Sequence, residues 1–470
     1  MGAGIRRREF LSGLCAAGTA GVGGCIRLKT DRDRKLSGSQ FGAPSVVSDH
    51  HLATEAGMEI LADGGTAADA AVTVASVLSV VQPWFSSVLG GGTWALYYDA
   101  ELDEVTSLDG VGPVGSDATL EDYKPKGNVA GMHQAVVPGA WDGWMLWLDR
   151  YGNKDLGRLL EPAVDIAREG YPVSSEMAYW LRTLSASIDK RPYASAVYKP
   201  DGELLGEGEL AYQRDMADTF ESLVGAFEEA RNEGRSEAFQ AARDYFYRGP
   251  IKQEIINFSE DNDGYLTLRD FEGFEAEIVD PISIEYADEY RLYQNPPNSQ
   301  GITMLLILNI LNKYDFSEME PDDPEAIHLQ VEATKIAFAD RYHHVGDPDR
   351  VDVPVQELLN EDYAAGQADR IEMDEVMEWP IESGLSGSDF DDADHTTTFH
   401  VVDEYGNAAA VTTSLGAEFL VIGDTGIHIN NRMRMVSVEE DNPNRLTPSY
   451  KVRHTSNPYM AFRDGRPYIV

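Results

Sequence analysis

The segment DDADHTTTFHVVDEYGN, residues 391–407, places three threonines at the start of a predicted strand. The preceding stretch SGLSGSDFDDAD is acidic and contains glycine and serine, which indicates a flexible linker. A threonine hydroxyl is a weak nucleophile unless a base lies beside it. If Thr396 were the first residue of a chain, its own α-amine, with a reference pKa of about 7.7–8.0, would be that base.

That amine exists only after the peptide bond between His395 and Thr396 has been cut. The Thr396 hydroxyl is able to make this cut itself, by attacking the His395 carbonyl to give an ester that water hydrolyses. A flexible linker suits the reaction, because the severed end must leave the site. Threonine also favours strands, so an ordinary strand explains the same pattern. We predict a processing site at His395–Thr396, with Thr396 as nucleophile and N-terminal amine.

A second segment, residues 259–270 (SEDNDGYLTLRD), imitates a calcium-binding loop, with acidic residues in ligand register and Gly264 at the turn. Its twelfth position holds Asp270, where a bidentate glutamate is usual. A glycine turn followed by a helix capped by Thr267 and Asp270 explains these residues as well. We prefer this structural interpretation.

Three other patterns were weighed as signs of phosphate binding, metal binding or serine hydrolase chemistry, and none supports such a function. The glycines at 90–92 lack the Gly-Lys-Ser/Thr of a phosphate loop, and we expect them to permit close backbone packing. His343 and His344 are adjacent, a poor arrangement for a shared metal, so we expect surface residues in a loop. No Gly-x-Ser-x-Gly elbow occurs, which argues against that class of serine hydrolase. We expect no metal and no cofactor.

The composition indicates a folded and very acidic protein. The chain has 470 residues, 43% of them hydrophobic, which is enough for a sizeable core. Its formal net charge is −42, which argues against a nucleic-acid partner because phosphates would be repelled. The acidic residues are scattered, so we interpret the charge as adaptation of the whole surface to high salt.

The first 25 residues predict an export signal. Arg7 and Arg8 precede a mild apolar stretch that is too short to span a bilayer, as in twin-arginine signals. VGGC then resembles a lipoprotein cleavage box, with Cys25 as the lipidated residue; an incidental cysteine after an ordinary signal is the alternative. Residues 26–44 fit a polar tether. We expect an extracellular or cell-surface protein, attached to the membrane only through this signal or lipid.

Periodicity predicts an α+β fold that begins near Ser45. Residues 51–65 fit a helix that ends at two glycines, and residues 66–82 fit a buried helix with Thr66 as N-cap and Asp69 completing a capping box. Residues 94–110 fit a hairpin, and strands dominate from Thr396 onward, where TTTFHVV is followed by a turn at DEYGN. Helices first and an antiparallel sheet later indicate a layered α+β arrangement.

Several blocks resemble one known family in its own order. They include HHLATEAGMEILADGGTAADAAVTVASVLSVVQPWFSSVLGGGTWALYYDA, VVPGAWDGWMLWLDRYG, PPNSQGITMLLILNIL and TTTFHVVDEYGN. The chain resembles the γ-glutamyltransferase family of N-terminal-nucleophile hydrolases from about Ser45 to its last residue. The resemblance implies a four-layer αββα sandwich. It also implies a large chain of residues 45–395 and a small catalytic chain that starts with 396–470, associated after cleavage.

The same resemblance assigns roles to particular residues. Thr396 is the nucleophile, and Ser414 is a second hydroxyl that supports it. The remaining substrate-binding positions all depart from the pattern of true transferases: Thr398 replaces a histidine, Gly416 an asparagine, Arg432 a glutamine, and Arg453 and His454 paired serines.

Other departures from the pattern of true transferases leave two substrate classes to consider. LDGVGP, residues 108–113, lacks the arginine that holds the substrate carboxylate in true transferases. Together with NNRMRMV at 430–436 it resembles a divergent subgroup of cephalosporin and glutaryl amidases. In that setting Arg432 and Arg453 would pair with a carboxylate of a dicarboxylic acyl group. Charges that only balance an acidic protein are the alternative.

The end of the sequence departs as well. The chain stops at RPYIV, where the family continues into a Pro-Gly-Gly segment whose backbone donors stabilise the oxyanion. We therefore expect the C-terminal part to be truncated; an inactive product is the alternative.

These observations lead to one functional hypothesis and two alternatives. The hypothesis is an exported, self-processed amidohydrolase or acyltransferase that cleaves γ-glutamyl amides such as glutathione through an acyl-enzyme on Thr396. The first alternative is a glutaryl- or cephalosporin-type N-acyl amidase that does not use glutathione. The second is an uncleaved binding or scaffold protein without turnover.

Overall fold

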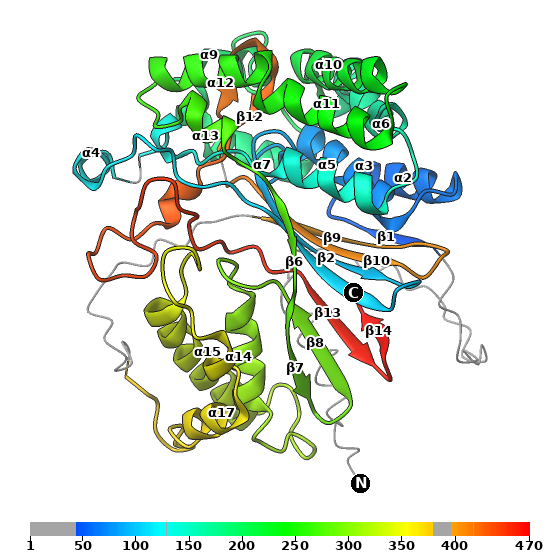
Figure 1. Ribbon diagram of the computed structural model, residues 1–470. Coiled ribbons are helices and arrows are strands. Elements are labelled where there is room, and N and C mark those ends of the chain that lie inside the picture. The colour runs from blue at the N-terminus through cyan, green and yellow to red at the C-terminus, as the bar shows by residue number, and fades with distance from the viewer. Residues whose placement is uncertain (1–43, 128, 379–395, 417) are drawn as a thin grey trace.

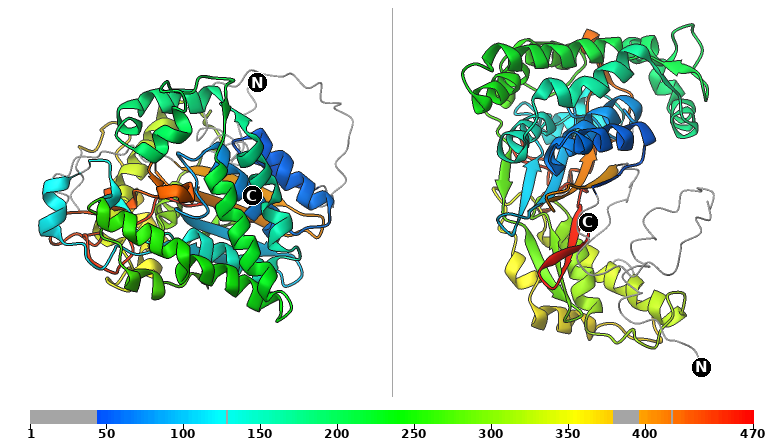
Figure 2. Two further views of the ribbon diagram at one scale, coloured as in Figure 1. Left: turned by 90° about the horizontal axis from the view of Figure 1, so that it is seen from above. Right: turned by 90° about the vertical axis from the view of Figure 1, so that its right-hand side faces the viewer.

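The computed structural model describes residues 44–127, 129–378, 396–416 and 418–470. These residues form four layers: helices, a sheet, a second sheet, and helices on the far side of the second sheet (Figure 1). The expected αββα sandwich is confirmed. The side view in Figure 2 shows the same stacking. The predicted signal, Cys25, most of the tether, and His395 lie outside the described residues.

Six antiparallel strands make the first sheet, in the order β1-β9-β10-β2-β3-β6. Their bounds are β1 Ser45–Val47, β9 Thr397–Val402, β10 Ala408–Ser414, β2 Gly92–Asp99, β3 Glu104–Gly110 and β6 Glu277–Val279. The late hairpin β9–β10 thus inserts between strands from the first 110 residues. The predicted order of helices first and sheet later is therefore only partly right, because the sheet draws strands from both ends of the chain.

Four antiparallel strands make the second sheet, in the order β14-β13-β8-β7. Their bounds are β7 Ile282–Tyr286, β8 Tyr290–Gln294, β13 Tyr459–Arg463 and β14 Arg466–Ile469. Leu96 and Ala410 of the first sheet pack against Met460 and Phe462 of the second, and all four are buried. This apolar contact holds the two sheets face to face.

The first helical layer covers the outer face of the first sheet, at the top of Figure 1. Its main helices are α2 His51–Ala62, α3 Ala67–Val81, α5 Ala140–Tyr151, α6 Leu156–Glu169, α10 Arg214–Ala230, α11 Arg235–Tyr247 and α12 Pro250–Asp261. Helix α3 is buried along its whole length and stops just before Pro83. The predicted capping box at its start is confirmed, because Thr66 and Asp69 each accept a hydrogen bond from the other's backbone N–H.

The second helical layer packs against the second sheet, at the lower left of Figure 1. It contains α14 Gly301–Leu311, α15 Pro324–His344 and α17 Glu361–Ala368. His343 and His344 form the last turn of α15, so their predicted position in a loop is wrong. The helix continues through both residues, and Val345 is its C-cap.

Shorter elements connect these layers. The helices are α4 Leu120–Lys126, α7 Ser175–Thr183, α8 Ser185–Ile188, α9 Pro192–Tyr198, α13 Leu268–Glu272 and α16 Val355–Leu358; the strands are β4 Tyr171–Pro172, β5 Leu210–Ala211, β11 Val421–Ile422 and β12 Ile427–His428. Thr267 and Asp270 form a capping box at the start of α13, with Thr267 N donating to Asp270 Oδ2 at 2.8 Å. The structural interpretation of residues 259–270 is therefore confirmed.

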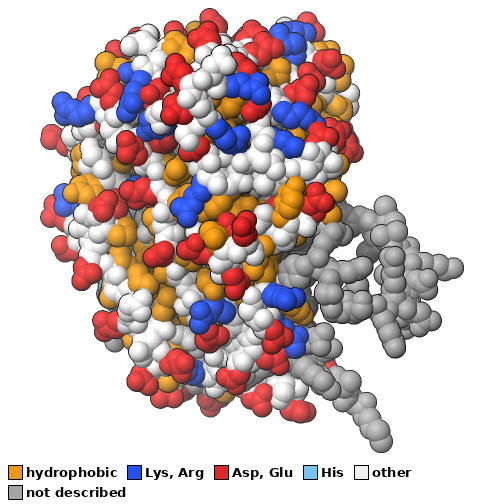
Figure 3. All heavy atoms as spheres, turned by 45° about the vertical axis from the view of Figure 1, so that its right-hand side comes forward, with side chains coloured by type: hydrophobic (Ala, Val, Ile, Leu, Met, Phe, Trp, Pro, Cys, Tyr) orange, Lys and Arg blue, Asp and Glu red, His pale blue; other side chains and the backbone are white. Residues whose placement is uncertain are grey.

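Acidic side chains are spread over the face of the molecule drawn in Figure 3, between fewer basic ones. Among the described residues, no helix has both the length and the apolar character needed to cross a bilayer.

Candidate active site

Thr396 lies immediately before β9, and strand pairing fixes its neighbour. Thr397 is opposite Thr413 in the β9–β10 ladder, so the next position along brings Thr396 beside Ser414. Their hydroxyl oxygens are 2.8 Å apart, within hydrogen-bond distance. Thr396 is half-buried and Ser414 is buried. The two hydroxyls that were predicted to act together are therefore in contact.

A second hydroxyl pair follows on the same face of the hairpin. Side chains alternate along a strand, so Thr398 points to the same side as Thr396. Its Oγ1 lies 3.1 Å from Thr412 Oγ1, and Thr398 is exposed to solvent. This predicted substrate-binding residue therefore lies at the open side of the site.

Side chains on the other face of β9 point toward the first helical layer and hold the strand in place there. Thr397 Oγ1 donates to Asp49 Oδ2 at 2.8 Å, and Phe399 is fully buried in the core under the helices. Asp49 belongs to the loop between β1 and α2. Sequence reasoning missed Asp49, since nothing in its local pattern links it to a strand almost 350 residues away.

The turn of the hairpin is attached to the central helix. Asp403 is fully buried and accepts hydrogen bonds from the backbone N–H groups of Ala67 at 2.8 Å and Tyr405 and Asn407 at 2.9 Å. Ala67 is the first residue of α3, so the carboxylate also meets the positive end of the helix dipole. The sequence predicted the turn but not this contact.

Glycines just before β2 let the backbone come close to β12 and to the end of β10. A Cβ at Gly90 would lie 1.9 Å from the His428 carbonyl oxygen, and one at Gly91 would lie 2.9 Å from that of Ser414. Both distances are shorter than the contacts that real Cβ atoms make, so a residue with a side chain would not fit at either position. The expectation that this glycine run permits close packing is confirmed.

Four residues, here called the Arg432 cluster, lie beyond Ser414: Gly416, Asn431, Arg432 and His454. A Cβ at Gly416 would lie 1.8 Å from Asn431 Oδ1 and 2.7 Å from Arg432 Nη2, so these groups fill the space beside Gly416. Arg432 is 1% exposed, and its Nη1 approaches Met435 Sδ at 3.8 Å. A buried guanidinium therefore lies beside Gly416, which is two residues along the chain from Ser414.

His454 completes the cluster as a neutral imidazole. Burial, with a smaller contribution from the charge of Arg432, lowers the pKa of His454 well below its usual value. Its Nδ1 accepts from Ser456 N at 3.2 Å, so the proton is carried by Nε2. A Cβ at Gly92 would be 3.6 Å from that nitrogen, and Gly92 pairs with Ser414. His454 therefore lies beside the strand ends that carry the hydroxyl pair.

Arg453 makes different contacts from Arg432. Its Nη1 donates to the carbonyl oxygens of Arg341 at 3.1 Å and Val345 at 3.3 Å, and its guanidinium lies 4.9 Å from the centre of the Tyr342 ring. These groups belong to the C-terminal end of α15, where a cation is favourable. The structure thus brings Thr396, Ser414, Gly416, Arg432 and His454 together, while Arg453 donates to the C-terminal end of α15.

A lysine from a distant part of the chain forms an ion pair with the segment at residues 108–113. Lys451 Nζ donates to Asp109 Oδ2 at 2.6 Å. The segment itself has no basic residue, as the sequence showed, but its carboxylate is neutralised by a lysine more than 300 positions later. Sequence spacing carries no signal for such a pair.

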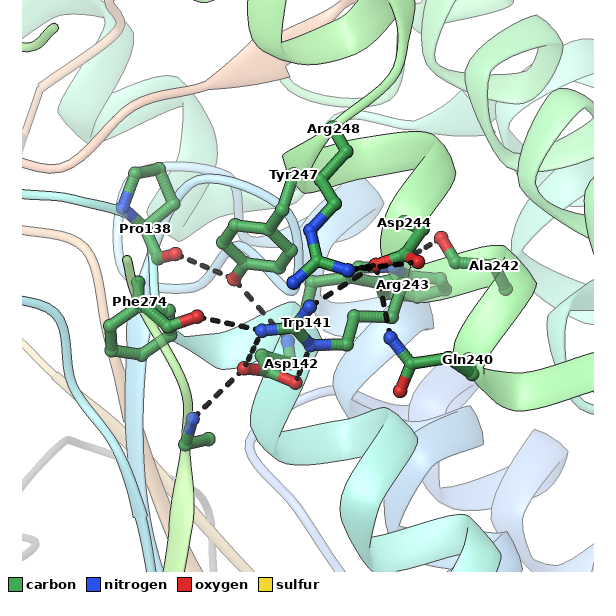
Figure 4. A network of polar contacts seen from close by, with 11 residues as sticks. Pro138, Trp141, Asp142, Gln240, Ala242, Arg243, Asp244, Tyr247, Arg248 and Phe274 are labelled. Atoms are coloured by element: carbon green, nitrogen blue, oxygen red, sulfur yellow. Dashed lines mark hydrogen bonds and ion pairs between the residues drawn. The ribbon is translucent and has the colours of Figure 1, made fainter. Parts of the chain in front are cut away.

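A second polar network lies in the first helical layer and is structural. Asp142 of α5 accepts from Arg243 of α11, at 2.6 Å from Nε and 3.0 Å from Nη2, and from Ala276 N at 2.9 Å (Figure 4). Arg243 also donates to the Phe274 carbonyl oxygen at 2.6 Å. Because the carboxylate has its partners within the protein, this network ties helices together and offers no reactive group.

Among the described residues there is no group of three histidine, cysteine or acidic side chains placed to hold a metal ion. The candidate site is therefore made of hydroxyls at one end and the Arg432 cluster at the other.

Comparisons with known proteins agree with this arrangement. Residues 53–470 match the family model of gamma-glutamyltranspeptidase. The chain is 36% identical over 431 residues to the glutathione hydrolase-like YwrD proenzyme of Bacillus subtilis strain 168, with 90% of this chain and 77% of the relative covered. It is 30% identical over 437 residues to the acylase ACY 1 proenzyme of Pseudomonas sp. strain SE83, with 90% and 74% covered.

A solved structure, the cephalosporin acylase from Bacillus halodurans, superimposes with a TM-score of 0.77 at 28% identity, covering 94% of this chain and 79% of the acylase. The chain belongs to the gamma-glutamyltranspeptidase family and is a hydrolase related to both the glutathione hydrolases and the acylases.

Proposed function

We propose that this protein is a self-processed N-terminal-nucleophile amidohydrolase that cleaves γ-glutamyl amides through an acyl-enzyme on Thr396. The observation that carries the proposal is the 2.8 Å contact between the hydroxyls of Thr396 and Ser414 at the start of β9. A nucleophile needs a partner that holds its hydroxyl in position and stabilises it as charge develops. Ser414 occupies that position.

The proposed maturation uses the same hydroxyl. Thr396 Oγ1 attacks the carbonyl carbon of His395, the peptide nitrogen leaves as the new α-amine of Thr396, and an ester links the two chains. Water then hydrolyses the ester, which leaves a carboxylate on His395 and a free hydroxyl on Thr396. The large and small chains stay associated, because β1 and β2 of the large chain pair with β9 and β10 of the small one.

Turnover repeats this chemistry on a substrate amide. The Thr396 hydroxyl adds to the amide carbonyl while its α-amine takes the proton, and the amine product leaves with that proton. The acyl group is then an ester on Thr396. Water, or an acceptor amine in a transfer reaction, attacks the ester and restores the hydroxyl.

A second candidate function is a glutaryl- or cephalosporin-type acylase, and the burial of Arg432 beside Gly416 favours it. A dicarboxylic acyl chain carries a carboxylate, and a guanidinium binds a carboxylate through charge-assisted hydrogen bonds. Of the two arginines predicted to bind such a carboxylate, the contacts favour Arg432, since Arg453 donates to the end of α15. The relative ACY 1 and the cephalosporin acylase structure support the same candidate.

Export and salt adaptation belong to the same proposal. The twin-arginine pattern in residues 1–25 would send the folded protein out of the cell, with Cys25 as a lipid anchor. The net charge of −42 would suit a salty medium, where screening reduces repulsion between like charges.

The experiment compares amine release from γ-glutamyl and glutaryl anilides by purified protein at high salt. The first substrate should be hydrolysed faster if γ-glutamyl amides are the natural class, and the second if the acylase function holds. Brief incubation followed by acid quenching should leave the acyl mass on the peptide that begins with Thr396. An intact, inactive protein would instead support the scaffold alternative.

A further inference from the structure

The first residues of β9 have a strand partner on one side only. On one side β10 pairs with β9 from Thr397 onward, but on the other side β1 pairs only with residues 400–402. β1 ends at Val47, opposite His400, so continuing its register by two residues would bring Asp49 opposite Thr398. In the part of the chain that the structure describes, the start of β9 therefore lacks a paired strand on the β1 side.

The side chain of Asp49 takes the place of that missing strand. Its Oδ2 accepts a hydrogen bond from Thr397 Oγ1 at 2.8 Å, and Thr397 is fully buried. Side chains alternate along a strand, so this bond lies on the helical face of the sheet, whereas the hydroxyls of Thr396 and Thr398 lie on the opposite face. The strand itself thus separates Asp49 from a substrate bound at Thr396.

The proposed cut makes a contact at this position important. Once the chain is cut, Thr396 is a chain end, and chain ends are poorly ordered unless they are tied down. Its hydroxyl must still lie 2.8 Å from that of Ser414, and displacing a reacting group by about 1 Å costs on the order of 10²-fold in rate. Thr397 directly follows the new end, and Asp49 belongs to the large chain. The bond between them therefore joins the two chains one residue from the cut.

The carboxylate of Asp49 lies in unfavourable electrostatic surroundings. It is exposed, and Glu176 of α7 is close enough for the charge of Asp49 to raise the pKa of Glu176, after the larger effect of burial. Asp403, at the other end of the same hairpin, differs because it is fully buried and accepts from three backbone N–H groups. Stability alone explains Asp403, but it does not explain a carboxylate beside a like charge.

We propose that Asp49 is a positioning residue that holds the start of the small chain, and with it the Thr396 nucleophile, in place after the cut. It acts through the hydrogen bond from Thr397 and touches neither the substrate nor the reacting atoms. The bond needs an acceptor at position 49 and a hydroxyl at position 397, but it does not need a negative charge. This inference rests on the proposed function and adds to it a residue of the large chain on which turnover depends.

The test measures the maximal single-turnover acylation rate per cleaved chain, and the substrate concentration that gives half of it. The substrate is whichever of γ-glutamyl and glutaryl anilide the wild type cleaves faster. Asp49→Ala and Thr397→Val should each lower the maximal rate about 10-fold and leave the half-saturating concentration unchanged, because bound substrate is not contacted. The double variant should be no slower than either single variant, since both remove the same bond. Asp49→Asn and Thr397→Ser keep the acceptor and the hydroxyl, so their rates should stay near that of the wild type.

Ser48→Ala is the matched control in the same loop. Ser48 Oγ lies 2.8 Å from Thr54 Oγ1 and donates to the His50 carbonyl oxygen at 3.0 Å, so this substitution loosens the loop but keeps the contact with β9. The acylation rate should stay at the wild-type value. A loss as large as that in Asp49→Ala would overturn the inference, because the loop as a whole would then be what matters.

A wild-type rate in Asp49→Ala or in Thr397→Val overturns the inference. A loss in Asp49→Asn as large as in Asp49→Ala also overturns it, since the charge and not the hydrogen bond would be responsible. If Asp49→Ala does not fold or is not cleaved, the variants of Thr397 decide: a loss in Thr397→Val but not in Thr397→Ser supports the inference, and equal rates overturn it. Wild-type protein that is cleaved and active, with every variant at its rate, contradicts this inference alone. Wild-type protein that releases no aniline from either substrate contradicts the proposed function, and this inference with it.

Discussion

The hydroxyl pair of Thr396 and Ser414 is fixed by regular strand pairing, whereas the Arg432 cluster is built from irregular backbone. In the hairpin, register alone brings the two oxygens to 2.8 Å, and the same register repeats with Thr398 and Thr412. In the cluster, position depends on a glycine with φ of +95° and on a buried guanidinium. The first region is suited to chemistry common to many amides, and the second to the choice between them.

Replacing the nucleophile should have the largest effect. Thr396→Ala removes the attacking oxygen, so it should abolish self-cleavage and lower kcat by at least about 10⁴-fold on any anilide. Thr396→Ser keeps a hydroxyl and is the matched control, which should still be cleaved and active. Comparable turnover by uncleaved Thr396→Ala would place the nucleophile elsewhere.

Substitution of Arg432 should change substrate specificity, whereas substitution of Arg453 should change stability. Arg432→Met should lower kcat/KM for carboxylate-bearing acyl anilides by about 10- to 100-fold, since a charged hydrogen bond is lost, and should affect a neutral acyl anilide much less. Arg453→Met should instead lower the free energy of unfolding, because the carbonyl oxygens of Arg341 and Val345 lose their donor. Denaturant titration and steady-state kinetics on both variants measure these effects. The opposite pattern would assign the carboxylate to Arg453.

The supporting hydroxyl should have a smaller effect than the nucleophile. Ser414→Ala should lower kcat by about 10- to 100-fold and slow self-cleavage, because the Thr396 hydroxyl loses its partner. Thr412→Val removes a hydroxyl from the equivalent pair two residues away on the same strand and should have a clearly weaker effect. Single-turnover kinetics would show the difference. Equal losses in both variants would mean that the strand, and not the contact with Thr396, is what matters.

Replacing Asp403 should lower the free energy of unfolding without a large loss of kcat. Asp403→Asn keeps the shape but turns one acceptor into a donor that faces either the N–H group of Ala67 or those of Tyr405 and Asn407, so the free energy of unfolding should fall by about 1–3 kcal/mol. Glu404→Gln, at the exposed neighbouring position, should be close to neutral. Denaturant titration of both variants tests this. A large loss of kcat in correctly cleaved, folded Asp403→Asn would show that the turn also positions Thr396.

The last prediction is a pH dependence of stability that comes from His428. Burial lowers its pKa to about 3, and its Nε2 lies 2.7 Å from the Tyr198 hydroxyl. The folded state keeps this imidazole neutral while the unfolded state takes up a proton near pH 6.5, so the contribution to stability is present above that pH and is lost as the pH falls toward 3. The difference in unfolding free energy between wild type and His428→Gln should therefore shrink on acidification. A difference that is constant between pH 7 and pH 4 would contradict this assignment.

Local patterns in the sequence were enough to predict the parts of the fold that depend on neighbours in the chain. The capping box of Thr66 and Asp69, the turn after β9 and the partnership of Thr396 with Ser414 all follow from short-range spacing or from the family resemblance. Contacts between distant segments were not predictable in this way. Asp403 at the start of α3 and Asp49 on Thr397 join residues more than 300 positions apart, and no periodicity encodes them.

The Arg432 cluster shows the same limit within the site. Arg432 and Arg453 are equivalent by residue type, and only the structure separates one beside Gly416 from one at the end of α15. Asn430 and Asn431 are adjacent and identical in type, yet one is fully bonded and the other has no partner among the described residues. Residue type predicts which chemistry is available, and packing decides which group performs it.

The most direct test of the central claim is the mass of the purified wild-type protein together with the N-terminal sequence of its smallest chain. The account predicts two associated chains, the smaller beginning Thr-Thr-Thr-Phe-His. A single chain with the bond between His395 and Thr396 intact, in protein that nevertheless hydrolyses γ-glutamyl anilide, would contradict it.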